Sequence, residues 1–125
     1  MLKNKKIWAY LTVVYMIFLF YVSTLPGPVK EVYKSSIRET LHNAAHVPAY
    51  SILTFLVAQW LQLTEFKERS YLFAFLVAVG YGILNEIAQI PVPGRTACVS
   101  DACLNAVGSG IALLLIKNKI LKLQD

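Results

Sequence analysis

The sequence predicts an all-α, polytopic membrane protein with four transmembrane helices, and three observations lead to this fold class. Hydrophobic residues make up 57% of the 125 positions and charged residues only 15%, whereas soluble proteins average about 25% charged residues. The mean hydropathy is +0.55. Four apolar stretches, at residues 7–25, 44–63, 71–90 and 102–116, approach the roughly 17–25 residues that a hydrocarbon core about 30 Å thick requires. The length leaves room for one transmembrane domain, residues 1–125.

The first and last stretches need a further argument. Residues 7–25 follow the basic run "KNKK", as a signal-peptide core would, but they exceed its usual length of roughly 7–15 residues and no A-x-A-like cleavage site follows. We therefore predict a retained helix. Residues 102–116 extend only about 22 Å at 1.5 Å per residue, so Lys117 and Lys119 are expected to reach the interface and lengthen the span.

A short amphipathic helix is predicted on the outer surface, before the second span. Ser36 and Glu39 fit a capping box, and Ile37 and Leu41 recur at helical spacing. Pro48, near the start of the second span, is expected either in the first helical turn or at a kink.

The distribution of Lys and Arg predicts that both termini are cytoplasmic. With the N-terminus inside, eight basic residues fall in cytoplasmic segments and four in outer ones, as the positive-inside rule requires. The inner set is Lys3, Lys5, Lys6, Lys67, Arg69, Lys117, Lys119 and Lys122, and the outer set is Lys30, Lys34, Arg38 and Arg95. The net charge of +5 then reflects this bias and contact with anionic lipid. No nucleic-acid partner is expected, because a folded basic domain is absent from the sequence.

Polar residues collect at the outer ends of three spans and form one layer there: His46, Tyr50, Glu86, Gln89, Asp101 and Asn105. Glu86 continues the row of Ala74, Ala78 and Gly82, whose spacing of four residues favours close helix packing. Its side chain is therefore expected to face protein. An unpaired charge at mid-membrane costs about 2.5–3.5 kcal/mol, against about 3–6 kcal/mol that the apolar residues of this span contribute to insertion. Glu86 should consequently be protonated, hydrated, or paired with Arg95 or His46.

The motifs in this layer resemble those of the VanZ-like membrane proteins, a family named after a teicoplanin-resistance accessory protein. The resemblance covers residues 42–112 and rests on "HVPAY", Glu-x-x-Gln, "PGR" and Asp-x-x-x-Asn-x-x-Gly-x-Gly. Family members often carry an Asp-Lys pair four and three residues before the histidine, where this chain has His42 and Asn43. The resemblance implies a multi-pass protein of the bacterial cell membrane with a role at the envelope and towards antibiotics.

Each polar residue has a functional and a structural interpretation. The candidate catalytic residues are His46, Glu86 and Asp101, and the candidate binding residues are Tyr50, Gln89, Arg95 and Asn105. Arg95 suits a phosphate or carboxylate, because its guanidinium forms paired hydrogen bonds with such groups. Structurally, Asp101 fits an N-cap of the fourth span, and Gly108 and Gly110 are expected to be packing residues.

Metal ligation and disulfide formation are also considered. His42 and His46, four residues apart, would suit zinc with Glu86 or Asp101 as third ligand. No H-E-x-x-H motif is present, so we expect no metal and no cofactor. Cys98 and Cys103 form a disulfide in an oxidising setting or remain reduced, and neither belongs to a redox C-x-x-C motif.

Three classes of function remain open. The favoured one is an outer-leaflet pocket that binds a membrane lipid, a lipid-linked wall precursor or a lipoglycopeptide and contributes to teicoplanin-type resistance. The alternative is a lipid-modifying enzyme that uses Glu86, Asp101, His46 and Arg95. In the third, the polar layer only stabilises the bundle or a partner interface, and the small-residue rows leave a homo-oligomer open.

Overall fold

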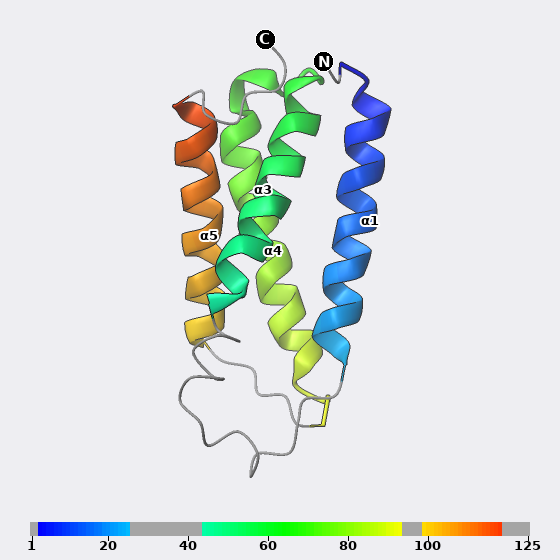
Figure 1. Cartoon of the computed structure of the whole chain (residues 1–125), viewed down its shortest axis with the longest axis vertical. Helices are drawn as coiled ribbons and strands as arrows, with labels where there is room; N and C mark the ends of the chain where they lie inside the picture. The colour runs from blue at the N-terminus through cyan, green and yellow to red at the C-terminus, as the bar shows by residue number, and fades with distance from the viewer. Residues whose placement is uncertain (1–2, 26–43, 94–98, 119–125) are drawn as a thin grey trace.

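The computed structural model describes residues 3–25, 44–93 and 99–118, and these form an antiparallel bundle of long helices (Figure 1). The elements are α1 (Lys5–Thr24), α3 (His46–Gln62), the short 3-10 helix η2 (Lys67–Arg69), α4 (Ser70–Gln89) and α5 (Val99–Lys117). The described part contains no strand, so the all-α prediction is confirmed. Each long helix coincides within a few residues with one of the four apolar stretches. The amphipathic helix expected before the second span lies outside the described residues.

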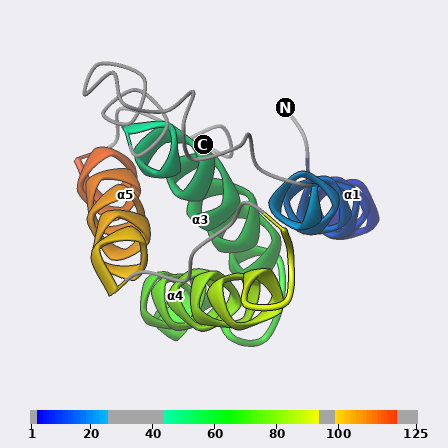
Figure 2. The ribbon, with the colours of Figure 1, turned by 90° about the horizontal axis from the view of Figure 1, so that it is seen from below.

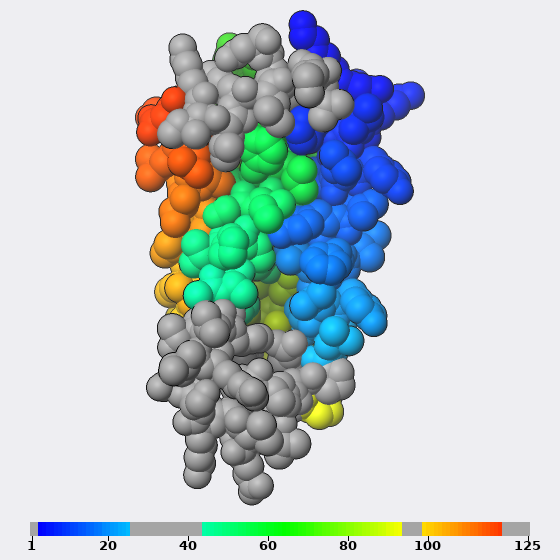
Figure 3. Space-filling model, viewed as in Figure 1, coloured from blue at the N-terminus to red at the C-terminus, as the bar shows by residue number. Residues whose placement is uncertain are grey.

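Helix α3 is the centre of the bundle. It packs against α1, α4 and α5, whereas α1 and α5 lie on opposite sides of it and share no contact among the described elements (Figure 2). In the space-filling view, α3 is accordingly seen between α5 and α1, with side chains filling the space between the helices (Figure 3). The buried core comes mostly from α3 and α4, with one residue from α5: Tyr50, Leu53, Val57, Ala58, Ala74, Ala78 and Ile116.

Three segments are long and apolar enough to cross a membrane: Lys5–Thr24, Lys67–Gln89 and Val99–Lys117. Large apolar side chains such as Ile17, Leu84 and Leu114 are exposed on their outer faces, as lipid-facing side chains of spanning helices would be. Helix α3 has 17 residues and extends about 26 Å at 1.5 Å per residue. It is packed against the other three long helices and is one residue shorter than the 18 that the three candidate spans reach.

Local sequence explains where the helices begin and end. The side chain of Asn4 caps α1 by accepting a hydrogen bond from the Lys6 backbone N–H at 3.0 Å. Helix α1 ends before Leu25, whose backbone is extended, because the residue before a proline avoids the helical region. Pro48 is the third residue of α3, in the first turn, where a backbone N–H has no partner within the helix. The first-turn interpretation of Pro48 is therefore confirmed.

Two buried glycines allow the helices to approach closely at the lower end of the bundle in Figure 1. A Cβ atom at Gly108 of α5 would lie 2.3 Å from the Val47 carbonyl oxygen of α3, so α5 contacts the α3 backbone directly. The Ser51 hydroxyl of α3 donates to the Gly108 carbonyl at 2.7 Å across the same contact. A Cβ atom at Gly82 of α4 would lie 2.7 Å from Asn105 Nδ2. Gly110 has no neighbour within 4 Å of such an atom, so its predicted packing role is wrong within the described residues.

Candidate functional site

The predicted polar layer lies at the end of the bundle where α4 finishes and α3 and α5 begin. Ala74, Ala78 and Gly82 are buried, and Glu86, the next member of their row, is only 7% exposed. The prediction that this row faces protein is thus confirmed. Asp101 is 8% exposed. The carboxylates of Glu86 and Asp101 are therefore buried inside the bundle.

All three candidate catalytic residues come together although they belong to three different helices. A ring nitrogen of His46 from α3, a carboxylate oxygen of Glu86 from α4 and a carboxylate oxygen of Asp101 from α5 all lie within 4.8 Å of one another. Two acids and an imidazole at this separation suit proton transfer, binding of a cation, or hydrogen bonding to a polar ligand. We call these three residues the His–Glu–Asp cluster.

Asn105 orients the histidine of this cluster. His46 Nδ1 lies 2.8 Å from Asn105 Oδ1, and because an amide oxygen only accepts hydrogen bonds, Nδ1 carries the hydrogen. In the neutral imidazole, Nε2 then has the lone pair and is the basic or ligating atom. Asn105 is 1% exposed, so its position is fixed by the surrounding helices. The ring of His46 also stacks on Tyr50 with an interplanar angle of 15°.

A second hydrogen bond joins α3 to α4 beside the cluster. Asn85 Nδ2 donates to the Tyr50 hydroxyl at 2.8 Å, and both side chains are buried. Asn85 was not among the residues singled out from the sequence. The sequence nevertheless contains an indication of its role, because a side-chain amide inside an apolar helix needs a buried hydrogen-bond partner.

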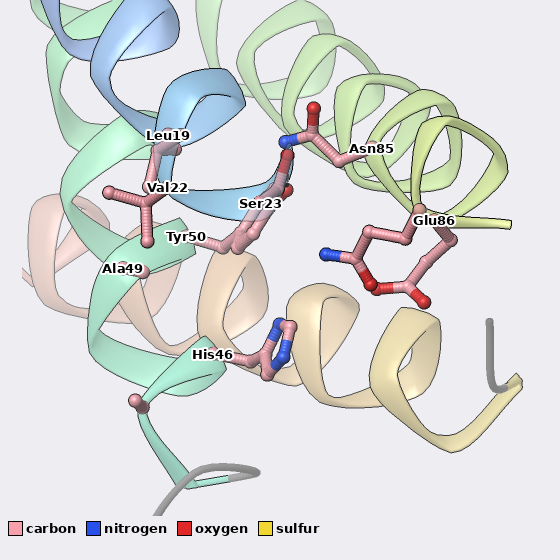
Figure 4. Close-up of a pocket in the computed structure, with 10 residues that line it drawn as sticks. Leu19, Val22, Ser23, His46, Ala49, Tyr50, Asn85 and Glu86 are labelled. Atoms are coloured by element: carbon pink, nitrogen blue, oxygen red, sulfur yellow. Dashed lines mark hydrogen bonds between the residues drawn. The ribbon is translucent and has the colours of Figure 1, made fainter. Parts of the chain in front are cut away.

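A cavity of about 190 Å³ opens between α1, α3 and α4 next to the cluster (Figure 4). Its polar side is formed by Ser23, His46, Tyr50, Asn85, Glu86 and Gln89, and its apolar side by Leu19, Val22, Ala45 and Ala49. The sequence did not indicate that α1 lines a cavity, because nothing in an apolar helix shows which of its faces will meet one. Asp101 and Asn105 are not among the lining residues and support the cavity through His46.

Two buried amide atoms beside the cavity lack hydrogen-bond partners within the described residues: Asn85 Oδ1 and Asn105 Nδ2. Buried polar atoms are nearly always paired, and an exception often indicates a water molecule, an ion or a ligand site. The combination of a cavity, a polar cluster and unpaired amide atoms identifies this end of the bundle as the candidate site.

Some predicted residues fall elsewhere. Arg95, His42 and Cys98 lie outside the described residues, so neither the position of Arg95 in the site nor the disulfide is observed. Cys103 is an exposed free cysteine. Asp101 is the third residue of α5 and not its N-cap, so that structural interpretation is corrected. Its carboxylate still lies in the first turn, where the positive end of the helix dipole favours it.

Comparison with known families decides the identity of the chain. The model of the VanZ/LLP1 family matches residues 7–122, and this range includes nearly all of the four long helices. The chain belongs to the VanZ/LLP1 family. Searches among curated proteins and among solved structures gave no match. For this VanZ/LLP1 protein, the family match extends the sequence resemblance from residues 42–112 to almost the whole chain.

Proposed function

We propose that this VanZ/LLP1 protein binds a membrane lipid or a lipid-linked envelope component in the cavity between α1, α3 and α4. The observation that carries the proposal is the composition of the cavity. One side is apolar and is supplied by Leu19, Val22 and Ala49, while the other presents His46, Glu86 and Asn85. An amphiphile matches both sides, with its chain against the apolar wall and its headgroup against the polar residues.

The size of the cavity limits what enters it. Pockets that enclose a drug-sized ligand measure about 300–1,000 Å³, whereas this cavity measures about 190 Å³. It therefore accommodates a headgroup fragment or the first part of a chain, and the rest of the lipid lies outside along the helices. Gln89 and Tyr50 supply hydrogen-bonding groups at the polar end. Arg95 follows α4 by six positions in the sequence, and we assign it the anionic part of the headgroup.

The charge distribution supports a site at the outer leaflet. All Lys and Arg residues that the structure describes lie at the opposite end of the bundle: Lys3, Lys5, Lys6, Lys67, Arg69 and Lys117. By the positive-inside rule that end is cytoplasmic. In the proposed topology α3 also crosses the membrane, as the second of four spans, both termini lie in the cytoplasm, and the cavity faces the exterior of a bacterial cell membrane.

At this position the protein would meet lipid-linked wall precursors and lipoglycopeptide antibiotics. We therefore extend the proposal to teicoplanin-type resistance, through shielding of a precursor or capture of the antibiotic. Expression of the chain in a sensitive bacterium should raise the teicoplanin concentration needed to stop growth. Arg95→Ala should abolish this effect at an unchanged level of protein in the membrane, and loss of folded protein would instead favour a purely structural role.

A second candidate is an enzyme that modifies a lipid, and the His–Glu–Asp cluster favours it. Glu86 or Asp101 would serve as general base and His46 as acid or nucleophile, since their ligand atoms lie within 4.8 Å of one another. In this case purified protein alters a lipid or releases phosphate, and Glu86→Gln stops turnover while lipid capture continues. No turnover over a broad lipid panel would exclude this candidate.

The binding proposal is tested by lipid that copurifies with the full chain. Lipid per protein is measured by mass spectrometry for Val22→Trp, which fills the cavity from α1, and for Val13→Trp. Val13 is exposed and does not line the cavity. It precedes Val22 by nine residues, which is about two and a half helical turns, so it lies on the face of α1 opposite to Val22. Val22→Trp should lower the retained lipid at least about tenfold, which corresponds to about 1.4 kcal/mol, whereas Val13→Trp should not. Equal retention by the two variants would refute the proposal.

A further inference from the structure

We propose that the His–Glu–Asp cluster binds one divalent transition-metal ion of the zinc class, in place of the expectation of no metal that the sequence motifs gave. The inference goes beyond lipid binding and does not depend on it. It starts from the observation that His46, Glu86 and Asp101 present their ligand atoms within 4.8 Å of one another from three separate helices.

The distances and the donor atoms suit such an ion. Tetrahedral zinc binds nitrogen and oxygen at about 2.0–2.2 Å, which places ligand atoms about 3.3–3.6 Å apart. Rotations of the two carboxylate side chains that move their oxygens by about 1 Å close the cluster to these separations. One imidazole among the three donors disfavours Ca²⁺ and Mg²⁺, since both ions are bound by oxygen ligands.

The charge balance at the site gives a second argument. Glu86 and Asp101 are 7% and 8% exposed, in a bundle of apolar helices, and two buried carboxylates this close repel each other strongly. A divalent cation neutralises both carboxylates, and with a neutral imidazole the centre has no net charge. A neutral centre is the form that a low-dielectric site tolerates best.

The surroundings of the cluster give a third argument. A histidine that binds a metal usually donates its other ring N–H to a carboxylate, a carbonyl or a water, which fixes the tautomer and the ring orientation. His46 has this arrangement, because Nδ1 donates to Asn105 Oδ1 at 2.8 Å. Asn105 Nδ2, in turn, is buried without a hydrogen-bond partner in the described part of the chain, so this group is available to donate to an oxygen atom that enters the site.

Three protein ligands leave a fourth position open, as in zinc sites that bind a water or a substrate atom. His46 and Glu86 also line the cavity, so the open position faces it. The chemical class of group that would occupy this position is an oxygen donor such as water, a phosphate or a carbonyl.

The test uses Co²⁺ as a coloured substitute for zinc and full-length protein without a polyhistidine tag, purified in detergent in the presence of a chelator that is then removed. Equilibrium dialysis and visible absorption should show one Co²⁺ per chain, displaced by Zn²⁺, which binds such sites more tightly. His46→Ala, Glu86→Gln and Asp101→Asn should each weaken Co²⁺ binding at least about 100-fold, and Asn105→Ala about 10–100-fold.

Glu68→Gln is the matched control, because Glu68 is exposed in η2 at the opposite end of the bundle and its loss should leave Co²⁺ binding unchanged. Far-ultraviolet circular dichroism verifies that each variant is folded. Folded wild-type protein that binds no Co²⁺ would overturn the proposal. Co²⁺ binding that persists in Asp101→Asn but disappears in His46→Ala and Glu86→Gln would also overturn it, because Asp101 would then not be a ligand. Lipid retention by the chelated protein is measured separately, so either proposal can fail alone.

Discussion

Gly108→Ala should destabilise the bundle, and its neighbour Gly110→Ala should not. The new methyl group at position 108 would lie 2.3 Å from the Val47 carbonyl oxygen and 3.0 Å from the Val47 Cα and carbonyl carbon. A carbon and an oxygen in contact are about 3.3 Å apart, so α3 must move away from α5 by about 1 Å. The obstacle is backbone, and a change of side-chain rotamer does not relieve it.

The expected magnitude follows from three contributions. Overpacking costs about 1–3 kcal/mol, and displacement of α3 weakens the hydrogen bond from Ser51 to the Gly108 carbonyl, worth about 1 kcal/mol. The higher helix propensity of Ala offsets about 1 kcal/mol. Gly108→Ala should therefore lower the free energy of unfolding by about 1–3 kcal/mol. At Gly110 nothing lies within 4 Å of the added methyl group, so only the propensity gain of about 1 kcal/mol remains.

The assay is unfolding of the full chain in mixed micelles by increasing amounts of a denaturing detergent, followed by circular dichroism. Each variant adds one methyl group to the same helix, at positions two residues apart, so detergent binding and helix length are matched. The reasoning would be refuted if Gly108→Ala were as stable as Gly110→Ala, since α3 and α5 would then tolerate a larger separation than the structure indicates.

Three further predictions concern α4, α1 and the topology. Gly82→Ala places a methyl group 2.7 Å from Nδ2 of Asn105, the residue that orients the cluster histidine, and should weaken Co²⁺ binding about tenfold. Gly80→Ala, with nothing within 4 Å of its methyl group, should leave Co²⁺ binding unchanged. Equal Co²⁺ affinities of the two variants would contradict the close approach at Gly82. Tyr15→Phe removes a 2.8 Å hydrogen bond to an α3 carbonyl and should cost about 1 kcal/mol in unfolding experiments, while Tyr10→Phe, at a side chain that is 69% exposed, is the neutral control. In intact cells, a membrane-impermeant maleimide should label Cys103 when the other cysteine is replaced by serine; labelling only after the cells are broken would reverse the proposed orientation.

The positions of the helices followed from the sequence, because length and hydropathy alone determine which segments can cross a bilayer. The inward direction of the Glu86 side chain also followed from the sequence. Residues spaced by four lie on the same face of a helix, so Glu86 shares the face of the small residues that pack against protein. The start of α5 did not. Asp101 fits an N-cap by residue type, but the helix begins two residues earlier, and helix boundaries depend on contacts that residue type does not specify.

The cavity was beyond prediction from the sequence for a different reason. Val22 and Leu19 look like any other apolar residues of a spanning helix, and their position depends on the rotation of α1 about its own axis. That rotation is fixed by tertiary contacts, such as the hydrogen bonds that Tyr15 donates to Ala49 and Tyr81 donates to Met16. Asn85 carries no charge, and its partner Tyr50 lies 35 residues away in the sequence, so residue type and spacing did not indicate this pairing.

Helix α1 supplies one wall of the cavity and has no contact with α5, whereas the His–Glu–Asp cluster is built on α3, α4 and α5 alone. A tilt of this single peripheral helix would therefore widen the cavity sideways, towards the acyl chains, while the distances within the cluster stayed the same. If the cavity binds lipid as proposed, lipids of different width then enter it while the geometry of the His–Glu–Asp cluster is unchanged.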